Sequence, residues 1–377
     1  MDSPYANELK VAIAAVQAAS TLSALVLSQA QAQAAQDAQG GPSQQELGTV
    51  SKDDLSPVTI ADFAIQALLT STLHAAFPDD KFVGEESAAT LRANPALLER
   101  VWQALQAIRV DSPSSSAGVT FPDSPECMCE FIDWCGEGLP HTTGRVWVFD
   151  PIDGTENFVQ GLVYAVNVAL LVDSAQTLSV VGCPNMSMDV SYPAGDHSLD
   201  PAGEGCILLA VRGHGAWVRK LRGDVDEVEV KQIPRHASTE ALEDLRSVSA
   251  LNTSGLGVVH TEVAVRLGVE FPGCVLLPWV IRWVLLALGV GNATWWVYKS
   301  RSRLAKIWDH AGAMLLFEEV GGRISDVDGE PISMVAGRKM TANYGIIAAP
   351  AALHEKVLQT VRDVLAKEAP ELVAKPA

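Results

Sequence analysis

The fold of this chain is constrained most strongly by a block of short apolar segments between residues 145 and 230. The segments are rich in Val, Ile, Leu and Ala, and no helical pattern interrupts them. They predict strands at 145–149, 165–172, 178–182, 206–211, 215–219 and 226–231. Successive strands joined without a helix pair as antiparallel hairpins, whereas a doubly wound parallel sheet needs a helix between them. The block therefore predicts a layered α/β fold with antiparallel pairing.

Helical patterns lie on both sides of this block. We expect helices at 8–39, 59–76, 90–108, 125–135, 259–268, 280–289, 308–320 and 350–367, and further strands at 81–84, 294–298, 323–326 and 344–348. A length of 377 residues exceeds what one small core requires. The length therefore indicates two packed subdomains or one large α/β unit, and we predict the subdomains as residues 1–200 and 201–377.

The charge balance limits the partners that this chain can bind. It carries 27 Lys and Arg against 45 Asp and Glu, a formal net charge of −18. Such a field repels phosphate backbones and argues against a nucleic-acid-binding surface, so a small anionic ligand would need a local cation. The N-terminus lacks the basic segment of a signal peptide, and Pro278 and Arg282 interrupt the apolar window at 275–290. These features predict a cytoplasmic protein that does not bind membranes.

The most informative chemistry lies in the segment 147–155. A hydrophobic strand leads to Asp150, and Pro151 then forces a turn before Asp153. Two carboxylates on either side of such a turn can converge on one point, with the carbonyl of Ile152 between them. Hard oxygen ligands of this kind suit Mg²⁺. The segment therefore predicts a magnesium site.

The residues after this turn favour an anion but also allow a structural role. Gly154 and Thr155 would offer backbone N–H groups at the start of a helix, where an anion binds well. Asp153 and Glu156 also have the spacing of a helix capping box. A capping box explains neither Asp150 nor the turn that follows it.

Three further acidic residues are candidates, and each has an ordinary structural explanation. Glu85 follows the strand expected at 81–84, where adjacent glutamates usually lie in a solvated loop. Asp309 lies in the first turn of an expected helix, where the helix dipole favours a carboxylate. Asp62 lies near the start of another expected helix and would be either a cap or a general base. Taken one at a time, these residues leave both interpretations open.

Four motifs occur in order along the chain: Ser56-Pro57-Val58-Thr59 with Asp62, Gly84-Glu85-Glu86-Ser87, Asp150-Pro151-Ile152-Asp153-Gly154-Thr155, and Trp308-Asp309-His310-Ala311-Gly312. Their combination resembles the inositol monophosphatase superfamily of Mg²⁺-dependent, lithium-sensitive phosphatases. Within it, Phe77-Pro78-Asp79-Asp80-Lys81 and Lys306-Ile307-Trp308-Asp309-His310 make the chain most similar to the fungal 3'(2'),5'-bisphosphate nucleotidases. The resemblance covers nearly the whole chain. It implies a five-layer αβαβα sandwich with the active site between its two subdomains.

By matching position, the resemblance implies two Mg²⁺ ions and a third, more weakly bound one. Glu85, Asp150 and the carbonyl of Ile152 would hold the first ion. Asp150, Asp153 and Asp309 would hold the second, and Glu85 would take part in the third. The N-terminal subdomain would thus supply most ligands, and the C-terminal subdomain would supply Asp309. The ions would also let an acidic protein accept a phosphate ester.

The resemblance also implies roles for the residues around the ions. Asp62, with Thr155 beside it, would orient and deprotonate the attacking water. Thr155 and the backbone N–H groups of Gly154 and Thr155 would bind the phosphoryl oxygens as charge develops on them.

The positions that would hold the nucleotide depart from the nucleotidase pattern. Glu156-Asn157 stands where those enzymes usually have Lys-Gly, and Trp279 and Arg282 stand where a Ser and a Lys help to hold the nucleotide. Arg282 would still pair with a phosphate. Trp279, with the tryptophans that follow it, would either line an aromatic-rich substrate pocket or pack into the core. The catalytic residues are thus retained, while the substrate-binding residues differ.

Three functions are compatible with this pattern. The first is a Mg²⁺-dependent phosphomonoesterase that releases the 3'-phosphate of adenosine 3',5'-bisphosphate. The second is the same hydrolysis on another small phosphate, such as an inositol phosphate or an isoprenoid metabolite phosphate. The third is a non-catalytic phosphate-binding protein, which the retained Asp62 and Thr155 argue against. We expect a monomer that binds a small-molecule phosphate ester.

Overall fold

The computed structural model describes residues 3–39, 57–111, 118–195, 198–223, 228–235, 241–250, 252 and 254–373. Ser56, the first residue of the first motif, lies outside these ranges. The α-helices are α1 (Ala6–Gln39), α2 (Pro57–Ala76), α3 (Ala89–Ala93), α4 (Pro95–Asp111), α5 (Pro125–Gly136), α6 (Thr155–Val159), α7 (Gly257–Leu267), α8 (Trp279–Leu288), α9 (Ala313–Glu319) and α10 (His354–Glu368). The strands are β1 (Lys81–Gly84), β2 (Arg145–Asp153), β3 (Ala165–Val172), β4 (Ala175–Cys183), β5 (Cys206–Val211), β6 (Gly215–Lys220), β7 (Lys231–Ile233), β8 (Thr294–Trp296), β9 (Gly322–Ser325) and β10 (Ile346–Pro350).

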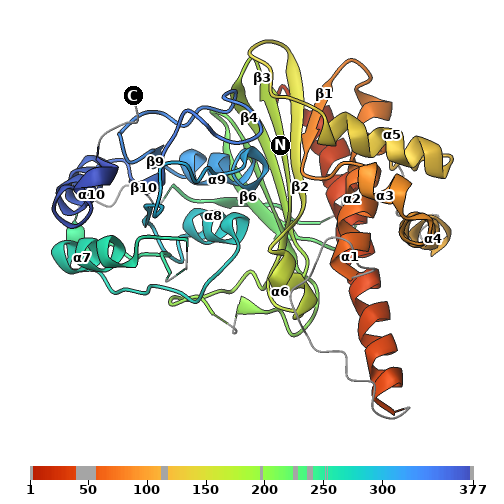
Figure 1. The fold of residues 1–377 in the computed structure, drawn as a ribbon, viewed down its shortest axis with the longest axis horizontal. Helices are drawn as coiled ribbons and strands as arrows, with labels where there is room; N and C mark the ends of the chain where they lie inside the picture. The colour runs from red at the N-terminus through yellow and green to blue at the C-terminus, as the bar shows by residue number, and fades with distance from the viewer. Residues whose placement is uncertain are drawn as a thin grey trace.

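These elements stack in five layers (Figure 1). Helices α1 and α2 cover one face of a seven-stranded sheet formed by β1–β7, and α8 and α9 cover its other face. A three-stranded sheet in the order β8-β10-β9 comes next, and α7 and α10 form the outermost layer. The order αβαβα confirms the predicted layered α/β fold.

The seven-stranded sheet is antiparallel except at one edge. Strand β1 pairs in parallel with β2, and each later pair of neighbours is antiparallel. Strands β5–β7 follow residue 200 and extend the same sheet. This sheet therefore crosses the subdomain boundary expected at residue 200, and that boundary stays a prediction. The strand expected at 226–231 appears as β7 at Lys231–Ile233, and residues 224–227 lie outside the described ranges.

Both faces of this sheet are buried, which explains its continuous apolar strands. Along β2, Val146 and Val148 belong to the core that includes α8 and α9, whereas Trp147 and Phe149 belong to the core that includes α1 and α2. Successive side chains of a strand point to opposite faces. A strand that is covered on both sides is therefore apolar at nearly every position.

Helix α1 is also explained by burial in this fold. Its segment Ala6–Gln33 is long and apolar enough to cross a membrane, by length and composition. However, 56% of its most apolar window is buried inside the molecule. The helix packs on α2 and β4, and Ala12 and Val16 are fully buried there.

The helix expected at 90–108 is interrupted at Asn94. A residue before proline disfavours the helical conformation, whereas proline is well suited to the first turn of a helix. The chain accordingly ends α3 before Asn94 and begins α4 at Pro95. The Asn94 Oδ1 atom accepts a hydrogen bond from the N–H of Leu97 at 3.1 Å and caps the new helix.

Candidate active site

Strand β2 ends in a bulge that brings two carboxylates together. Its pairing with β3 is regular up to Asp150, opposite Asn167, and resumes at Asp153, opposite Ala165. Residues three apart on a regular strand point to opposite faces, and the extra residue of a bulge reverses that alternation. The Oδ1 atom of Asp150 accepts a hydrogen bond from the N–H of Ile152 at 3.1 Å and stabilises the turn.

Asp309 reaches this site because the chain before α9 is attached to β3. The Nδ2 atom of Asn167 donates to the carbonyl of Trp308 at 2.6 Å. In a continuous α-helix that carbonyl would accept from the N–H of Gly312. The expectation of one helix over 308–320 was therefore wrong: Ile307–Asp309 forms a 3₁₀ turn and α9 begins only at Ala313.

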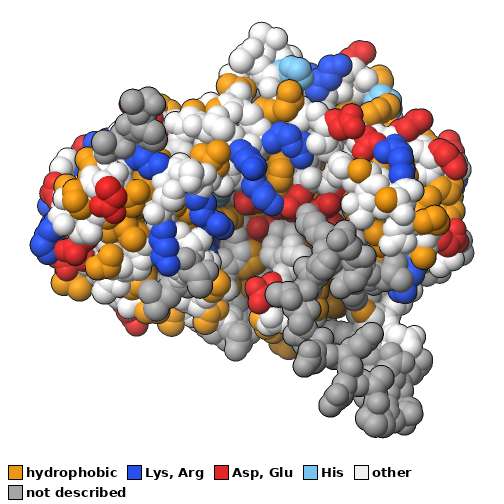
Figure 2. All heavy atoms as spheres, viewed as in Figure 1, with side chains coloured by type: hydrophobic (Ala, Val, Ile, Leu, Met, Phe, Trp, Pro, Cys, Tyr) orange, Lys and Arg blue, Asp and Glu red, His pale blue; other side chains and the backbone are white. Residues whose placement is uncertain are grey.

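The structure brings Asp150, Asp153 and Asp309 into one cluster. Each offers a carboxylate oxygen, and these oxygens lie within 4.8 Å of one another. Burial raises the pKa values of Asp150 and Asp153 well above their usual range and that of Asp309 to about 7, and neighbouring carboxylates add to these increases. Figure 2 shows acidic side chains in a hollow near the centre of the molecule, with Lys and Arg side chains beside it.

This set of side chains fits a divalent cation. Carboxylates that are buried close together repel one another, and the burial penalises their charged forms. A cation removes both penalties, and carboxylate oxygens are the ligands that hard divalent cations prefer. Asp150, Asp153 and Asp309 are thus suited to hold a metal ion.

Glu85 and Asp62 approach this cluster from the N-terminal half. Glu85 directly follows β1, which pairs in parallel with β2 so that Gly84 lies opposite Phe149. It therefore lies beside the end of β2 that carries Asp150. Asp62 lies on α2 and is buried. Burial is the largest cause of the raised pKa of Asp150, and the charges of Glu85 and Asp62 raise it further.

The turn formed by Asp153 and Gly154 docks on the start of α8. Gly154 has a φ of +93°, and a Cβ atom there would lie 2.3 Å from the Cγ of Pro278. One residue earlier, the Oδ2 atom of Asp153 accepts a hydrogen bond from the N–H of Val280 at 2.8 Å. Only glycine at position 154 allows this turn to approach Pro278 so closely. Thr155 begins α6 and is exposed.

Arg282 is enclosed by aromatic rings. Its side chain is 2% exposed, and its Cζ atom lies 4.6 Å from the ring centre of Trp279 and 4.5 Å from that of Trp296. The Nε atom donates to the carbonyl of Leu277 at 3.0 Å, while Nη1 has no hydrogen-bond partner among the described residues. The charge of Arg282 partly offsets the burial that raises the pKa of Asp153. The two predicted substrate-binding residues, Trp279 and Arg282, thus stack on each other close to the acidic cluster.

Arg338 is a residue near the site to which the sequence analysis assigned no role. Its Nη2 atom donates to the carbonyls of Gly84 at 2.5 Å and Glu85 at 3.3 Å, and its Nη1 atom donates to those of Cys135 and Gly138. It thereby fixes the backbone that carries Glu85. A lone arginine that binds backbone carbonyls leaves no motif in the sequence.

Lys306 is a second residue without an assigned role. Its Nζ atom lies 2.7 Å from the Oε1 atom of Glu85. The residue belongs to one of the motifs that carry the family resemblance, and this was its only signal in the sequence.

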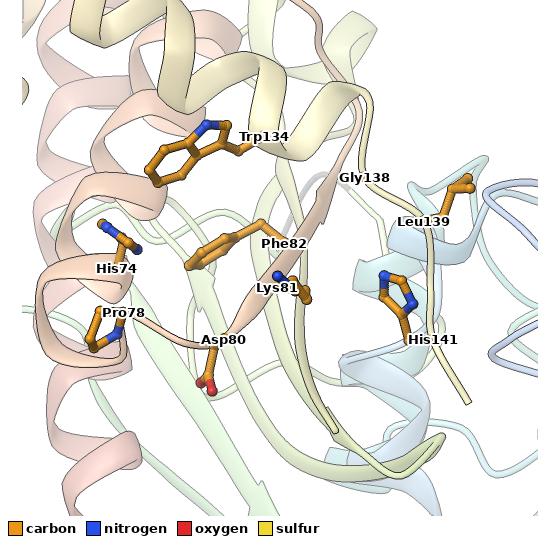
Figure 3. Close-up of a pocket in the computed structure, with 9 residues that line it drawn as sticks. All are labelled: His74, Pro78, Asp80, Lys81, Phe82, Trp134, Gly138, Leu139 and His141. Carbon is orange, nitrogen blue, oxygen red and sulfur yellow. The ribbon is translucent and has the colours of Figure 1, made fainter. Parts of the chain in front are cut away.

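A separate cavity of about 380 Å³ lies at the start of β1, away from the acidic cluster. Figure 3 shows the rings of His74, Phe82 and Trp134 around it. Its acidic residue, Asp80, accepts hydrogen bonds from Arg145 Nε and from the indole of Trp147, each at 2.8 Å. No predicted site residue lines this cavity, so the candidate chemistry lies at the opposite end of β1.

Comparisons with known proteins agree with this geometry. A profile described as the inositol monophosphatase family matches residues 7–366. The 3'(2'),5'-bisphosphate nucleotidase of Emericella nidulans is 34% identical over 328 residues, which cover 84% of this chain and 91% of that protein. The enzyme of the same name from Schizosaccharomyces pombe is 32% identical over 366 residues and covers 96% of each chain.

A solved structure shares the fold. The crystal structure of inositol monophosphatase II from Staphylococcus aureus matches with a TM-score of 0.57 and 16% identity, covering 97% of this chain and 96% of that one. The layers, the acidic cluster and the sequence similarity thus lead to the same conclusion. This chain belongs to the inositol monophosphatase family and is a phosphoric monoester hydrolase.

Proposed function

We propose that this protein is a Mg²⁺-dependent phosphomonoesterase that releases the 3'-phosphate of adenosine 3',5'-bisphosphate. The observation that carries the proposal is the cluster of Asp150, Asp153 and Asp309, whose oxygens lie within 4.8 Å of one another. The nucleotide is proposed because two fungal relatives of 32% and 34% identity are named 3'(2'),5'-bisphosphate nucleotidases. A cytoplasmic location and a monomeric state remain predictions.

Glu85, Asp150, the carbonyl of Ile152, Asp153 and Asp309 would hold two Mg²⁺ ions and a third, more weakly bound one. Bound there, magnesium would stabilise charge on the phosphoryl oxygens and lower the pKa of water at the site. The chain itself supplies two buried carboxylates, Asp150 and Asp153, and the half-buried Asp309 close to them. Inhibition by lithium belongs to the same proposal, because it comes from the same family resemblance.

Two further side chains would act on the attacking water. Asp62 would accept its proton, as the family resemblance implies; it is buried, and its charge reaches Asp150. The hydroxyl of Thr155 would orient the water. Helix α6 has only five residues, so the N–H groups of Gly154 and Thr155, more than a helix dipole, would bind the phosphoryl oxygens.

Replacing Thr155 with Ala is expected to lower kcat about 10²-fold, the usual scale for removing one group that stabilises the transition state. Magnesium affinity should stay the same, because Thr155 is not a proposed ligand. Phosphate release and calorimetric titration with Mg²⁺ measure the two quantities. Thr155→Ser keeps the hydroxyl and should lose far less activity. A Thr155→Ala variant with the wild-type kcat would contradict the assignment.

A second substrate class is favoured by the surroundings of Arg282. The rings of Trp279 and Trp296 both pack against its guanidinium group, and their centres lie 5.3 Å from each other. A buried guanidinium that packs against two rings has less of its surface free to pair with a phosphate. An inositol phosphate or an isoprenoid phosphate, which has no second phosphate on a nucleoside, would not need that contact.

Combining Trp279→Ser with Arg282→Lys is expected to shift specificity toward adenosine 3',5'-bisphosphate. The change removes one of the two rings that pack against the buried cation, which should raise kcat/KM for the bisphosphate over inositol monophosphate about tenfold. The ratio of kcat/KM values for the two substrates measures the effect. Trp279→Phe with Arg282→Lys is the control, because it keeps a ring over the cation. An unchanged ratio would show that the stacking does not determine specificity.

The function itself is tested by phosphate release from adenosine 3',5'-bisphosphate, inositol monophosphate and an isoprenoid phosphate. Each substrate is assayed with Mg²⁺ and with a chelator. We expect the bisphosphate to be hydrolysed fastest and hydrolysis to stop when the chelator removes the metal. Faster hydrolysis of one of the other two esters would show that the substrate belongs to the second class and is not the bisphosphate. Absence of hydrolysis with all three would favour the non-catalytic alternative.

A further inference from the structure

Lys306 places a positive charge at the edge of the site, where its side chain is 45% exposed. Its Nζ atom lies 2.7 Å from the Oε1 atom of Glu85, which belongs to the opposite half of the molecule. Its charge also interacts with those of Asp309 and Asp150. Lys306 therefore neutralises part of the charge that a bound cation would otherwise neutralise.

The backbone around Lys306 holds this lysine in place. Lys306 forms an antiparallel bridge with Lys339, and the N–H of Ile307 donates to the carbonyl of Arg338 at 3.0 Å. The ring of Trp308 lies 5.3 Å from the Lys306 Nζ atom and 4.8 Å from the Arg338 Cζ atom. The ammonium group thus extends from a fixed base toward Glu85.

The same short segment carries a proposed metal ligand and this counter-charge. Lys306 immediately precedes the 3₁₀ turn Ile307–Asp309. A divalent cation bound to Glu85 and Asp150 would meet a positive charge that already contacts one of these ligands. Like charges at such short distances repel strongly in a partly buried site. The lysine and the cation consequently compete for Glu85.

We propose that Lys306 is the built-in counter-ion of the metal-free cluster, and that divalent cations must displace it from Glu85 to bind. This inference rests on the proposed function, because it assumes that the cluster holds magnesium. Lys306 would keep the empty site folded and would make binding weaker than the carboxylates alone allow. It would thereby set the Mg²⁺ concentration at which the enzyme becomes loaded.

Lys306→Met tests this competition, because it keeps the length of the side chain and removes the charge. Calorimetric titration with Mg²⁺ alone should give a dissociation constant about tenfold lower than that of the wild type, equivalent to about 1.4 kcal/mol. The Tm of the metal-free variant should fall, because its carboxylates lose a compensating charge. Addition of Mg²⁺ should then raise the Tm by more than it does in the wild type.

Lys339→Met is the matched control. Lys339 lies opposite Lys306 in the bridge and is exposed, so the substitution removes the same formal charge from the same backbone pair. It should change Mg²⁺ affinity much less. Lys306→Arg keeps a charge that can still reach Glu85 and should retain weak binding.

A second comparison isolates Glu85. In a Glu85→Gln background, adding Lys306→Met should improve Mg²⁺ binding far less than in the wild-type background, because the contested carboxylate is gone. Unchanged or weaker Mg²⁺ binding in Lys306→Met, or equal gains in both backgrounds, would overturn the counter-ion role while leaving the proposed metal site intact. Absence of Mg²⁺ binding in every variant would overturn the proposed function and this inference together.

Discussion

Replacing Asp150 with Asn is expected to abolish turnover and to stabilise the metal-free protein. Asp150 is buried, and this burial is the largest cause of its raised pKa. The nearby negative charges raise that pKa further; they belong to Glu85, Asp309, Asp153 and Asp62. Removing this carboxylate relieves repulsion in the empty cluster, so the Tm without metal should rise. With metal, the site loses the ligand that the proposal assigns to both ions. The rate should fall by more than about 10²-fold, because even outer-shell changes cost up to that amount.

Three measurements check this expectation: phosphate release, calorimetric titration with Mg²⁺ and thermal unfolding with a chelator. Asp189→Asn is the control, because Asp189 is an exposed aspartate outside the cluster. It should leave all three quantities near their wild-type values. Near-normal turnover in Asp150→Asn, or a lower Tm without metal, would contradict the assignment of Asp150 as a buried ligand.

Replacing Gly154 with Ala is expected to damage the site through the backbone. Its φ of +93° costs a residue with a side chain roughly 1–2 kcal/mol. The added Cβ would also lie 2.3 Å from the Cγ of Pro278. The turn must then move away from α8, which weakens the hydrogen bond between Asp153 and the N–H of Val280. A displacement of about 1 Å is enough to misplace reacting groups and to lower the rate about 10²-fold.

Gly144→Ala is the control that separates the cost of a positive φ from the cost of a steric clash. Gly144 has a φ of +80°, and a Cβ atom there meets nothing within 4 Å. This variant should therefore show a lower Tm with a nearly normal rate, whereas Gly154→Ala should lose both stability and activity. Thermal unfolding and steady-state kinetics make the comparison. Equal rates in the two variants would show that the turn is free to move away from Pro278.

Local patterns were sufficient to predict much of this fold. The continuous apolar run at 165–172 predicted β3, because a strand covered on both faces needs apolar side chains on both. The Pro-containing turn predicted that Asp150 and Asp153 would converge, and the bulge in β2 is the structural form of that turn. Both predictions concern residues that are neighbours along the chain.

Local patterns failed where a distant residue changed the backbone. The helix expected at 308–320 lost its first turns because Asn167 takes the carbonyl of Trp308. The contact of Arg282 with both Trp279 and Trp296 likewise joins α8 to β8. Hydrogen bonds and ring contacts of this kind depend on which segments the fold brings together.

The sequence by itself determined the family, the layered architecture and the identity of the acidic residues, because local spacing and ordered motifs encode these features. Only the tertiary structure decided how Asp309 meets Asp150, and that Lys306 lies against Glu85. These pairs come from separate segments, and their distances follow from the packing of whole layers. Electrostatic energies depend on such distances and on burial, so the charge balance of the site is a property of the folded molecule.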